Sequence, residues 1–386
     1  MKSSLQRNIS MGLALFLISA FFTLHPKGAQ FLSPQNLSNL SIELAITAIL
    51  ALGMLVVLLP GMIDLSVGSG AGMLGGIACV LVVSPQYLGL PGHGWPAFLA
   101  LAAATLLALG LWAMMGALII RYRVPAFIIT LGGLLVFKGA HWAVIRNSTI
   151  PVAPGGTENF FSLLTTYYIP SWGGYLLLIL VSAGLFFARR RRRWLRLRHG
   201  LPVDDPKVDF LKFFVMFQCL LLLVVVMNHY KGTPLPLVIL GAVILAIQTI
   251  TRNTRFGRYL YAIGGNEEAA VLSGINVQRV IIGAYLLLGG VVALTGFMQT
   301  AYGGYTTTTV GNLMELDAIA ACVIGGTSLK GGRGTVSGVL FGALIMATLL
   351  NGMTLLAVTP EVKLIARGVV LVLAVWMDVR FSQTGK

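Results

Sequence analysis

Two polar residues, Asp64 and Ser66, interrupt an apolar part of the sequence where one hydrophobic run ends and another begins. Pro60 and Gly61 end the first run, so a new helix is expected to start just after Ser66. There the Asp64 carboxylate can accept the first backbone N–H groups of the new helix, as an N-cap does. It can also line a gate or passage for a polar solute, since charged groups inside a membrane are kept where they face a cavity. Both interpretations stay open, and one residue can serve both.

A second acidic pair, Glu315 and Asp317, begins a segment in which glycines interrupt the apolar pattern. Within residues 315–335 only about a dozen residues precede the glycines, fewer than the roughly 20 that a straight helix needs to cross a membrane. We therefore expect a half-helix followed by irregular backbone, as in many transporters. Both acids are expected near the outer surface of the membrane.

Catalysis and cofactor binding find no support in the residue types or their spacing. The glycines near Lys330 do not form a phosphate-binding loop, because Gly332 stands where that motif requires lysine. The 5 histidines are scattered, and the 3 cysteines lack the spacing of metal ligands. We predict no catalytic residue, no metal site and no cofactor, and expect the chain not to be an enzyme.

The composition indicates the environment in which these residues are placed. Of the 386 residues, 57% are hydrophobic and 10% are charged, whereas soluble domains have about 25% charged and 45–50% apolar residues. The mean hydropathy is +0.87, and the apolar runs are long enough to cross a bilayer. The sequence predicts one all-α, polytopic integral membrane domain over residues 1–386.

Apolar runs between proline, glycine and charged breakers predict about 10–12 transmembrane helices, including broken or half helices. The candidate spans are 9–24, 41–59, 68–84, 97–119, 125–145, 173–188, 210–228, 235–250, 280–299, 316–327, 336–350 and 362–378. The two spans within about 173–230 enclose a strongly basic loop.

The net charge of +15 would suggest nucleic-acid binding in a soluble protein, but here the basic residues lie between apolar runs and indicate membrane orientation. With the N-terminus in the cytoplasm, most of the 27 lysines and arginines fall on the cytoplasmic side. Both termini are therefore predicted to be cytoplasmic. The densest run, Arg189 to Arg198, is expected to anchor its span against anionic membrane lipid rather than to bind nucleic acid.

A cytoplasmic segment near 264–276 carries the signals of a short helix. Asn266 can cap it, two glutamates lie at its positive end, and Gly274 can close it in a left-handed conformation. The small alanines suit insertion into the cleft of a partner, where the partner surface passes close to them. The residues predicted to couple to that partner are Asn266, Glu267, Glu268, Ala269, Ala270 and Gly274.

Residues 268–274 resemble the E-A-A-x-x-x-G motif by which permeases of ATP-binding cassette (ABC) importers contact their ATPases. Three further blocks, at 63–69, 124–133 and 324–329, are similar to the ribose/xylose/galactose permease family in the same order along the chain. The greater length and the extra pair of spans with its basic loop look most like the xylose branch of that family. Residues 351–353 and 373–378 resemble that branch as well.

The resemblance implies a permease subunit that moves a monosaccharide, D-xylose or a related pentose or hexose, into the cytoplasm. It implies a homodimer in a bacterial inner membrane, with two cytoplasmic ABC ATPase subunits and a periplasmic sugar-binding protein. The residues proposed for the translocation path or gate are Asp64, Ser66, Lys138, Gln299 and Asn351. Lys138 departs from the family pattern, in which arginine is expected, so charge is kept but bidentate hydrogen bonding is lost. Gln299 and Asn351 can instead form hydrogen bonds between helices.

Two alternatives from other classes remain. An ion-coupled secondary sugar transporter would also have broken helices and would depend on an acid within the membrane, for which Glu43 and Asp64 are the candidates. A passive channel would need a selectivity ring and no energy source. The short helix within 264–276 favours the ABC importer over both.

Overall fold

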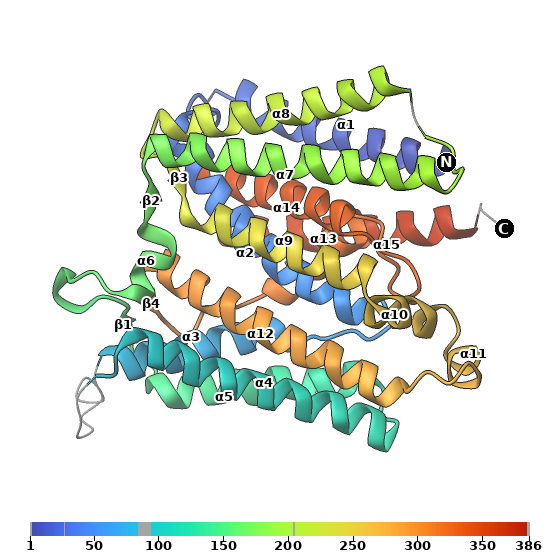
Figure 1. Cartoon of the computed structure of the whole chain (residues 1–386). Helices are drawn as coiled ribbons and strands as arrows, with labels where there is room; N and C mark the ends of the chain where they lie inside the picture. The colour runs from blue at the N-terminus through green and yellow to red at the C-terminus, as the bar shows by residue number, and fades with distance from the viewer. Residues whose placement is uncertain (1, 27, 84–93, 204, 384–386) are drawn as a thin grey trace.

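The computed structural model describes residues 2–26, 28–83, 94–203 and 205–383, and Figure 1 shows it as a helical bundle. The first half contains helices α1 (Lys2–Leu24), α2 (Pro34–Leu58), α3 (Val67–Val83), α4 (Ala97–Tyr122), α5 (Ala126–Ile145), the short α6 (Phe160–Thr166) and α7 (Ser171–Arg198). The second half contains α8 (Pro206–Asn228), α9 (Leu235–Asn253), α10 (Arg255–Gly265), α11 (Glu267–Leu272), α12 (Val277–Gly303), α13 (Met314–Ile324), α14 (Val336–Leu355) and α15 (Pro360–Gln383). A 3₁₀ turn, η2, covers Pro154–Gly156.

The predicted all-α membrane architecture is confirmed. Each of the twelve candidate spans overlaps a helix, apart from residue 84, which lies outside the described residues. Within the described part of the chain, 8 helices are long and apolar enough to cross a membrane, namely α2, α4, α5, α7, α8, α9, α12 and α14. The apolar part of α1 and the whole of α3 are shorter.

The centre of the bundle is α2, which is apolar and buried on all sides over residues 48–58. It packs against α9, α12, α13 and α14, as expected for a helix without a polar face. By contrast, α7 and α8 lie side by side at the edge, and most of their apolar side chains are exposed. This predicted extra pair has the exposure of helices that face lipid.

The two ends of the bundle differ (Figure 1). Both chain termini, α10 and α11 lie at one end, on the right of the view. The opposite end carries α6 and two small antiparallel ladders, which pair β1 (Ile150–Pro151) with β4 (Tyr305–Thr306) and β2 (Tyr168–Ile169) with β3 (Thr233–Pro234). These ladders close the connections between helices that are distant in sequence.

Candidate functional site

Residues 59–66 form the first of two breaks in the helical bundle. The chain turns at Gly61 with φ +84°, a conformation that a glycine adopts without strain, and α3 begins at Val67. Asp64 lies within this break and has no exposed surface.

Both oxygens of the Asp64 carboxylate accept hydrogen bonds. Oδ1 accepts from the Ser66 backbone N–H at 2.7 Å and from the Ser66 hydroxyl at 2.6 Å. Oδ2 accepts from the indole Nε1–H of Trp112 on α4 at 2.9 Å. The backbone N–H that Asp64 accepts belongs to Ser66, the residue before α3, so the carboxylate closes a turn that leads into the helix, and capping of the first N–H groups of α3 stays a prediction. The sequence did not predict that the same carboxylate also joins the break to α4. A role of Asp64 and Ser66 in a gate stays a prediction.

The second break surrounds α13. After α12 ends, the chain folds back along α3, so that Val310 lies against Gly72 and Gly311 lies against Gly68. A Cβ at Gly68 would come within 2.5 Å of the Gly311 carbonyl oxygen, so this close approach requires glycine. The half-helix α13 then spans 11 residues. The predicted half-helix is confirmed, but irregular backbone precedes it as well as following it.

Glu315 and Asp317 are enclosed within the bundle, and each residue is only 7% exposed. The expected position near the outer surface of the membrane stays a prediction. Because the fold-back carries the chain down the length of α3, Glu315 begins α13 beside Gly68, at the first turn of α3. Apolar run lengths alone could not predict this reversal, since the descending segment has no helical period.

The predicted short helix within 264–276 is confirmed as α11. The Asn266 side chain accepts the Ala269 backbone N–H at 2.9 Å, and Gly274 follows the helix with φ +79°. Glu267 and Glu268 occupy the first turn. The local chemistry of capping was thus sufficient to locate this helix.

One detail of that prediction is wrong. Ala270 was expected to face a partner, but its side chain is 3% exposed and belongs to the chain's own apolar core, whereas Ala269 is exposed. Two apolar side chains face outward instead, Leu272 at 89% exposure and Val271 at 55%. The signal for them in the sequence is a pair of aliphatic residues next to a charged first turn.

Helix α10 contacts residues from both breaks. A Cβ at Gly264 would lie 1.9 Å from the Leu59 carbonyl oxygen and 2.5 Å from the Gly332 nitrogen. The Gly332 N–H in turn donates to the Leu59 carbonyl at 2.8 Å. Three segments distant in sequence therefore meet backbone to backbone, which requires glycine at position 264.

Tyr261 adds a side-chain contact to this junction. Its hydroxyl donates to the Gly334 carbonyl at 2.8 Å. Burial raises the pKa of the Tyr261 phenol, while the charge of Arg252 acts in the opposite direction, so the hydroxyl keeps the proton that it donates. The segment carrying the predicted coupling residues is thus joined to the loops that begin and end the two breaks.

Asn351, a predicted path residue, lies in a different polar network. Its Nδ2 donates to Glu43 Oε2 at 3.2 Å, and its Oδ1 accepts from Asn36 Nδ2 at 3.0 Å. The Tyr302 hydroxyl donates to Glu43 Oε1 at 3.2 Å. These bonds connect α2, α12 and α14, which is the helix-to-helix role that the sequence left open.

The other two predicted path residues lie elsewhere. Gln299 is half-buried on α12, and Lys138 is half-buried on α5. The Lys138 ammonium lies 5.8 Å from the centre of the Trp142 ring, in cation–π geometry. Asp64 and Ser66 are hydrogen-bonded to each other, whereas Asn351 bonds to Glu43 and Asn36. The five predicted path residues therefore do not form one hydrogen-bonded network in the described part of the chain.

The described residues form an all-α bundle with 8 candidate spans and interrupted helices, which is the architecture of a polytopic membrane protein. The chain belongs to the family described as branched-chain amino acid transport system / permease component, whose model matches residues 36–375.

Three relatives come from this comparison. The xylose transport system permease protein XylH of Escherichia coli is 40% identical over 369 residues, covering 95% of this chain and 90% of the relative. The protein of the same name from Haemophilus influenzae is 37% identical over 368 residues, or 95% of both chains. The ribose import permease protein RbsC of Escherichia coli is 35% identical over 377 residues, or 98% of this chain and 95% of the relative. No solved structure matches the chain.

Proposed function

We propose that this chain is the membrane subunit of an ATP-driven importer that carries a pentose, D-xylose, into a bacterial cytoplasm. ATP hydrolysis belongs to separate cytoplasmic ABC subunits, and a periplasmic binding protein delivers the sugar. Two copies of the chain form the permease in the inner membrane. The names of the similar proteins support the substrate class, since they are xylose and ribose permeases.

The observation that carries this proposal is the α10–α11 unit. It presents Leu272 and Val271 outward at one end of the bundle, and its other side contacts Leu59 and Gly332 from the two breaks. Exposed aliphatic side chains on a rigid short helix are suited to a groove in a partner protein. A push on α11 by a partner reaches both interrupted helices through backbone contacts.

The distribution of charge supports a cytoplasmic position for this end of the bundle. Helix α7 ends in a run of arginines between Arg189 and Arg198, at the end of the bundle that also carries α10, α11 and both termini. Since basic segments are retained on the cytoplasmic side, we place α11 and both termini in the cytoplasm. This is the compartment in which an ATPase is available.

Co-purification of the permease with its ATPase tests the assignment. Leu272→Lys places a charge on the proposed contact and is expected to lower the amount of bound ATPase about tenfold or more, as loss of a central apolar contact does. The matched control is Leu201→Lys, at a side chain that is 53% exposed in the loop between α7 and α8. The control is expected to bind ATPase as the unaltered chain does.

Equal binding by both variants would remove α11 from the interface. The assignment to the ABC importers would be contradicted if the unaltered chain did not co-purify with the ATPase encoded by a neighbouring gene. Membrane insertion of both variants is checked by their yield and by size-exclusion profiles, because Leu272 is exposed and its replacement leaves the core unchanged.

A further inference from the structure

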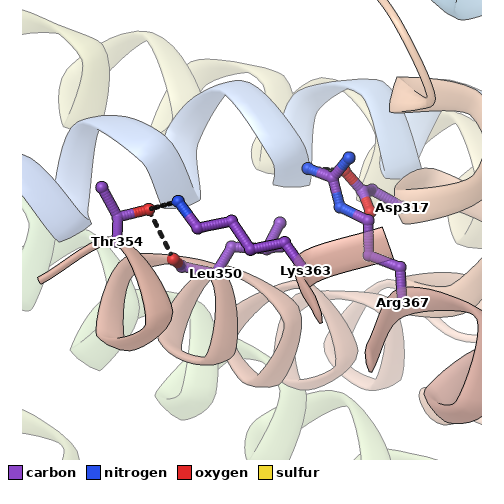
Figure 2. Close-up of polar contacts among 5 residues, drawn as sticks. All are labelled: Asp317, Leu350, Thr354, Lys363 and Arg367. Carbon is purple, nitrogen blue, oxygen red and sulfur yellow. Dashed lines mark hydrogen bonds and ion pairs between the residues drawn. The ribbon is translucent and has the colours of Figure 1, made fainter. Parts of the chain in front are cut away.

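Three charged side chains lie together where α13 begins, and Lys138 on α5 is near enough to act on one of them electrostatically. Arg367 on α15 forms an ion pair with Asp317, with 3.3 Å between Nη2 and Oδ2, and Figure 2 shows these two side chains next to each other. Glu315, two residues earlier on α13, interacts electrostatically with Asp317, with Arg367 and with Lys138 on α5. The cluster therefore draws on three helices.

Several polar atoms of this cluster lack a partner. Among the described residues, Glu315 Oε2, Asp317 Oδ1 and Arg367 Nε make no hydrogen bond. Both acids are more than nine-tenths buried. Buried polar groups are normally paired, and exceptions require an explanation such as a ligand. The contrast with Asp64 is direct, because both oxygens of that buried carboxylate are hydrogen-bonded.

The exposure of the two cations bears on what surrounds this side of the bundle. Lys138 is half-buried, and the Arg367 side chain is 25% exposed, yet both lie within the length of their helices. A charged side chain within the hydrocarbon region faces a water-filled cavity or the bundle interior, since contact with lipid tails is costly. Charges placed in this way favour a polar surrounding over lipid tails.

Resting on the proposed function, we propose that Glu315, Asp317, Arg367 and Lys138 form a sugar-contacting site in the translocation path. The carboxylates accept hydrogen bonds from sugar hydroxyls, and the guanidinium and ammonium groups donate to them. Two formal negative charges and two positive charges cancel, so the site offers strong hydrogen bonds without selecting an ion. Trp142, 42% exposed beside Lys138, adds an apolar face for the C–H groups of a pentose.

This site is connected to the coupling unit through a short stretch of chain. Helix α13 runs from Asp317 into the glycine loop, where Gly332 and Gly334 contact α10. A displacement of α10 thus reaches the start of α13 through one half-helix, which gives an ATPase a route to open and close the site.

Uptake assays with paired variants test the proposal. Arg367→Met and Asp317→Asn are expected to lower the maximal rate of D-xylose uptake about tenfold, the scale of one charge-assisted hydrogen bond, while bound ATPase and ATP hydrolysis stimulated by the binding protein stay unchanged. Lys363→Met is the matched control. Lys363 lies one turn before Arg367 on α15 and donates to the Thr354 hydroxyl at 3.0 Å (Figure 2). The control is expected to transport normally.

Exchanging the two charges of the ion pair distinguishes a purely structural role from contact with the sugar. The double variant Asp317→Arg with Arg367→Asp restores opposite charges but moves each hydrogen-bonding group. If the site contacts sugar, uptake stays low, and the ratio of maximal rates for D-xylose and D-ribose changes in Asp317→Asn. Full recovery in the exchanged variant, with an unchanged ratio, would show that the pair only joins α13 to α15.

Different results would contradict the sugar-contacting site and the importer function. If the unaltered chain imports D-xylose with ATP and the Arg367 and Asp317 variants import it equally well, the site is wrong and the importer assignment stands. If the unaltered chain, assembled with its ATPase and binding protein, imports no pentose, the proposed function is wrong and the site with it.

Discussion

The two helix breaks are built from similar residues, yet they treat their buried acids in opposite ways. In the first break, Asp64 receives hydrogen bonds on both oxygens from Ser66 and Trp112. In the second, Glu315 and Asp317 each keep one buried oxygen without a partner among the described residues. Both breaks reach the same contact with α10.

This difference distinguishes a fully hydrogen-bonded carboxylate from two carboxylates that each keep an unpaired oxygen. A fully paired carboxylate in a low-dielectric interior holds its neighbours in one arrangement, whereas a partly paired one lowers stability and leaves bonding capacity for something else. The hydrogen bonds of Asp64 in the first break therefore hold the start of α3 against α4. The second holds buried hydrogen-bonding groups without a partner among the described residues, which are the groups of the proposed sugar site. Variants in the first break should therefore mainly lower stability, and variants in the second should mainly lower transport.

The largest effect is expected at the junction that both breaks share. Gly264→Val places a side chain against the backbone of Leu59 and Gly332 and should lower the free energy of unfolding by more than about 3 kcal/mol, because backbone atoms cannot yield as side chains do. The neighbouring Gly265→Val is the control, since a Cβ there meets nothing within 4 Å. Thermal unfolding in detergent measures both. Equal losses at the two positions would mean that the junction adds no specific stability.

Asp64→Ala tests the anchoring role of the first break. The change leaves the Trp112 indole and the Ser66 N–H buried without a partner, so the expected loss is about 2–3 kcal/mol of unfolding free energy. Asp64→Asn should cost less, since one amide oxygen still accepts from Ser66 while the amide NH₂ meets the Trp112 donor. The same two substitutions at Asp317 should change unfolding less and uptake more. The reverse pattern would invert the proposed roles of the two breaks.

The smallest effect is expected for Tyr261→Phe. The variant loses only the hydrogen bond to Gly334, worth about 1 kcal/mol, and keeps the ring in place. Coupling should weaken by a measurable but modest amount, seen as fewer sugars imported per ATP hydrolysed. A complete loss of uptake would show that this bond itself transmits the ATPase movement.

The sequence was sufficient for features that depend on local chemistry. Apolar run length located the helices, and Asn266 with Gly274 located α11 because capping requires those residue types at those positions. Features that depend on distant parts of the chain were not predictable. The Trp112 bond to Asp64 and the pairing of Arg367 with Asp317 join residues about 50 positions apart, and the fold-back before α13 follows from packing on Gly68 and Gly72.

Ala270 is a residue whose role the sequence could not predict either. Its small size was assigned to a partner, but a small residue is equally required where a helix packs on its own protein, and the sequence does not distinguish the two causes. Leu272, which is almost fully exposed, carries the partner-facing chemistry instead.

The energy source for sugar uptake tests the central claim most directly. Proteoliposomes holding the permease and its ATPase are supplied with labelled D-xylose and the binding protein, first with ATP inside and then with a proton gradient alone. We expect accumulation that requires both ATP and the ATPase and that is lost in Gly264→Val. Accumulation driven by the proton gradient without any ATPase would contradict it, and would assign the buried acids to ion coupling in a secondary transporter.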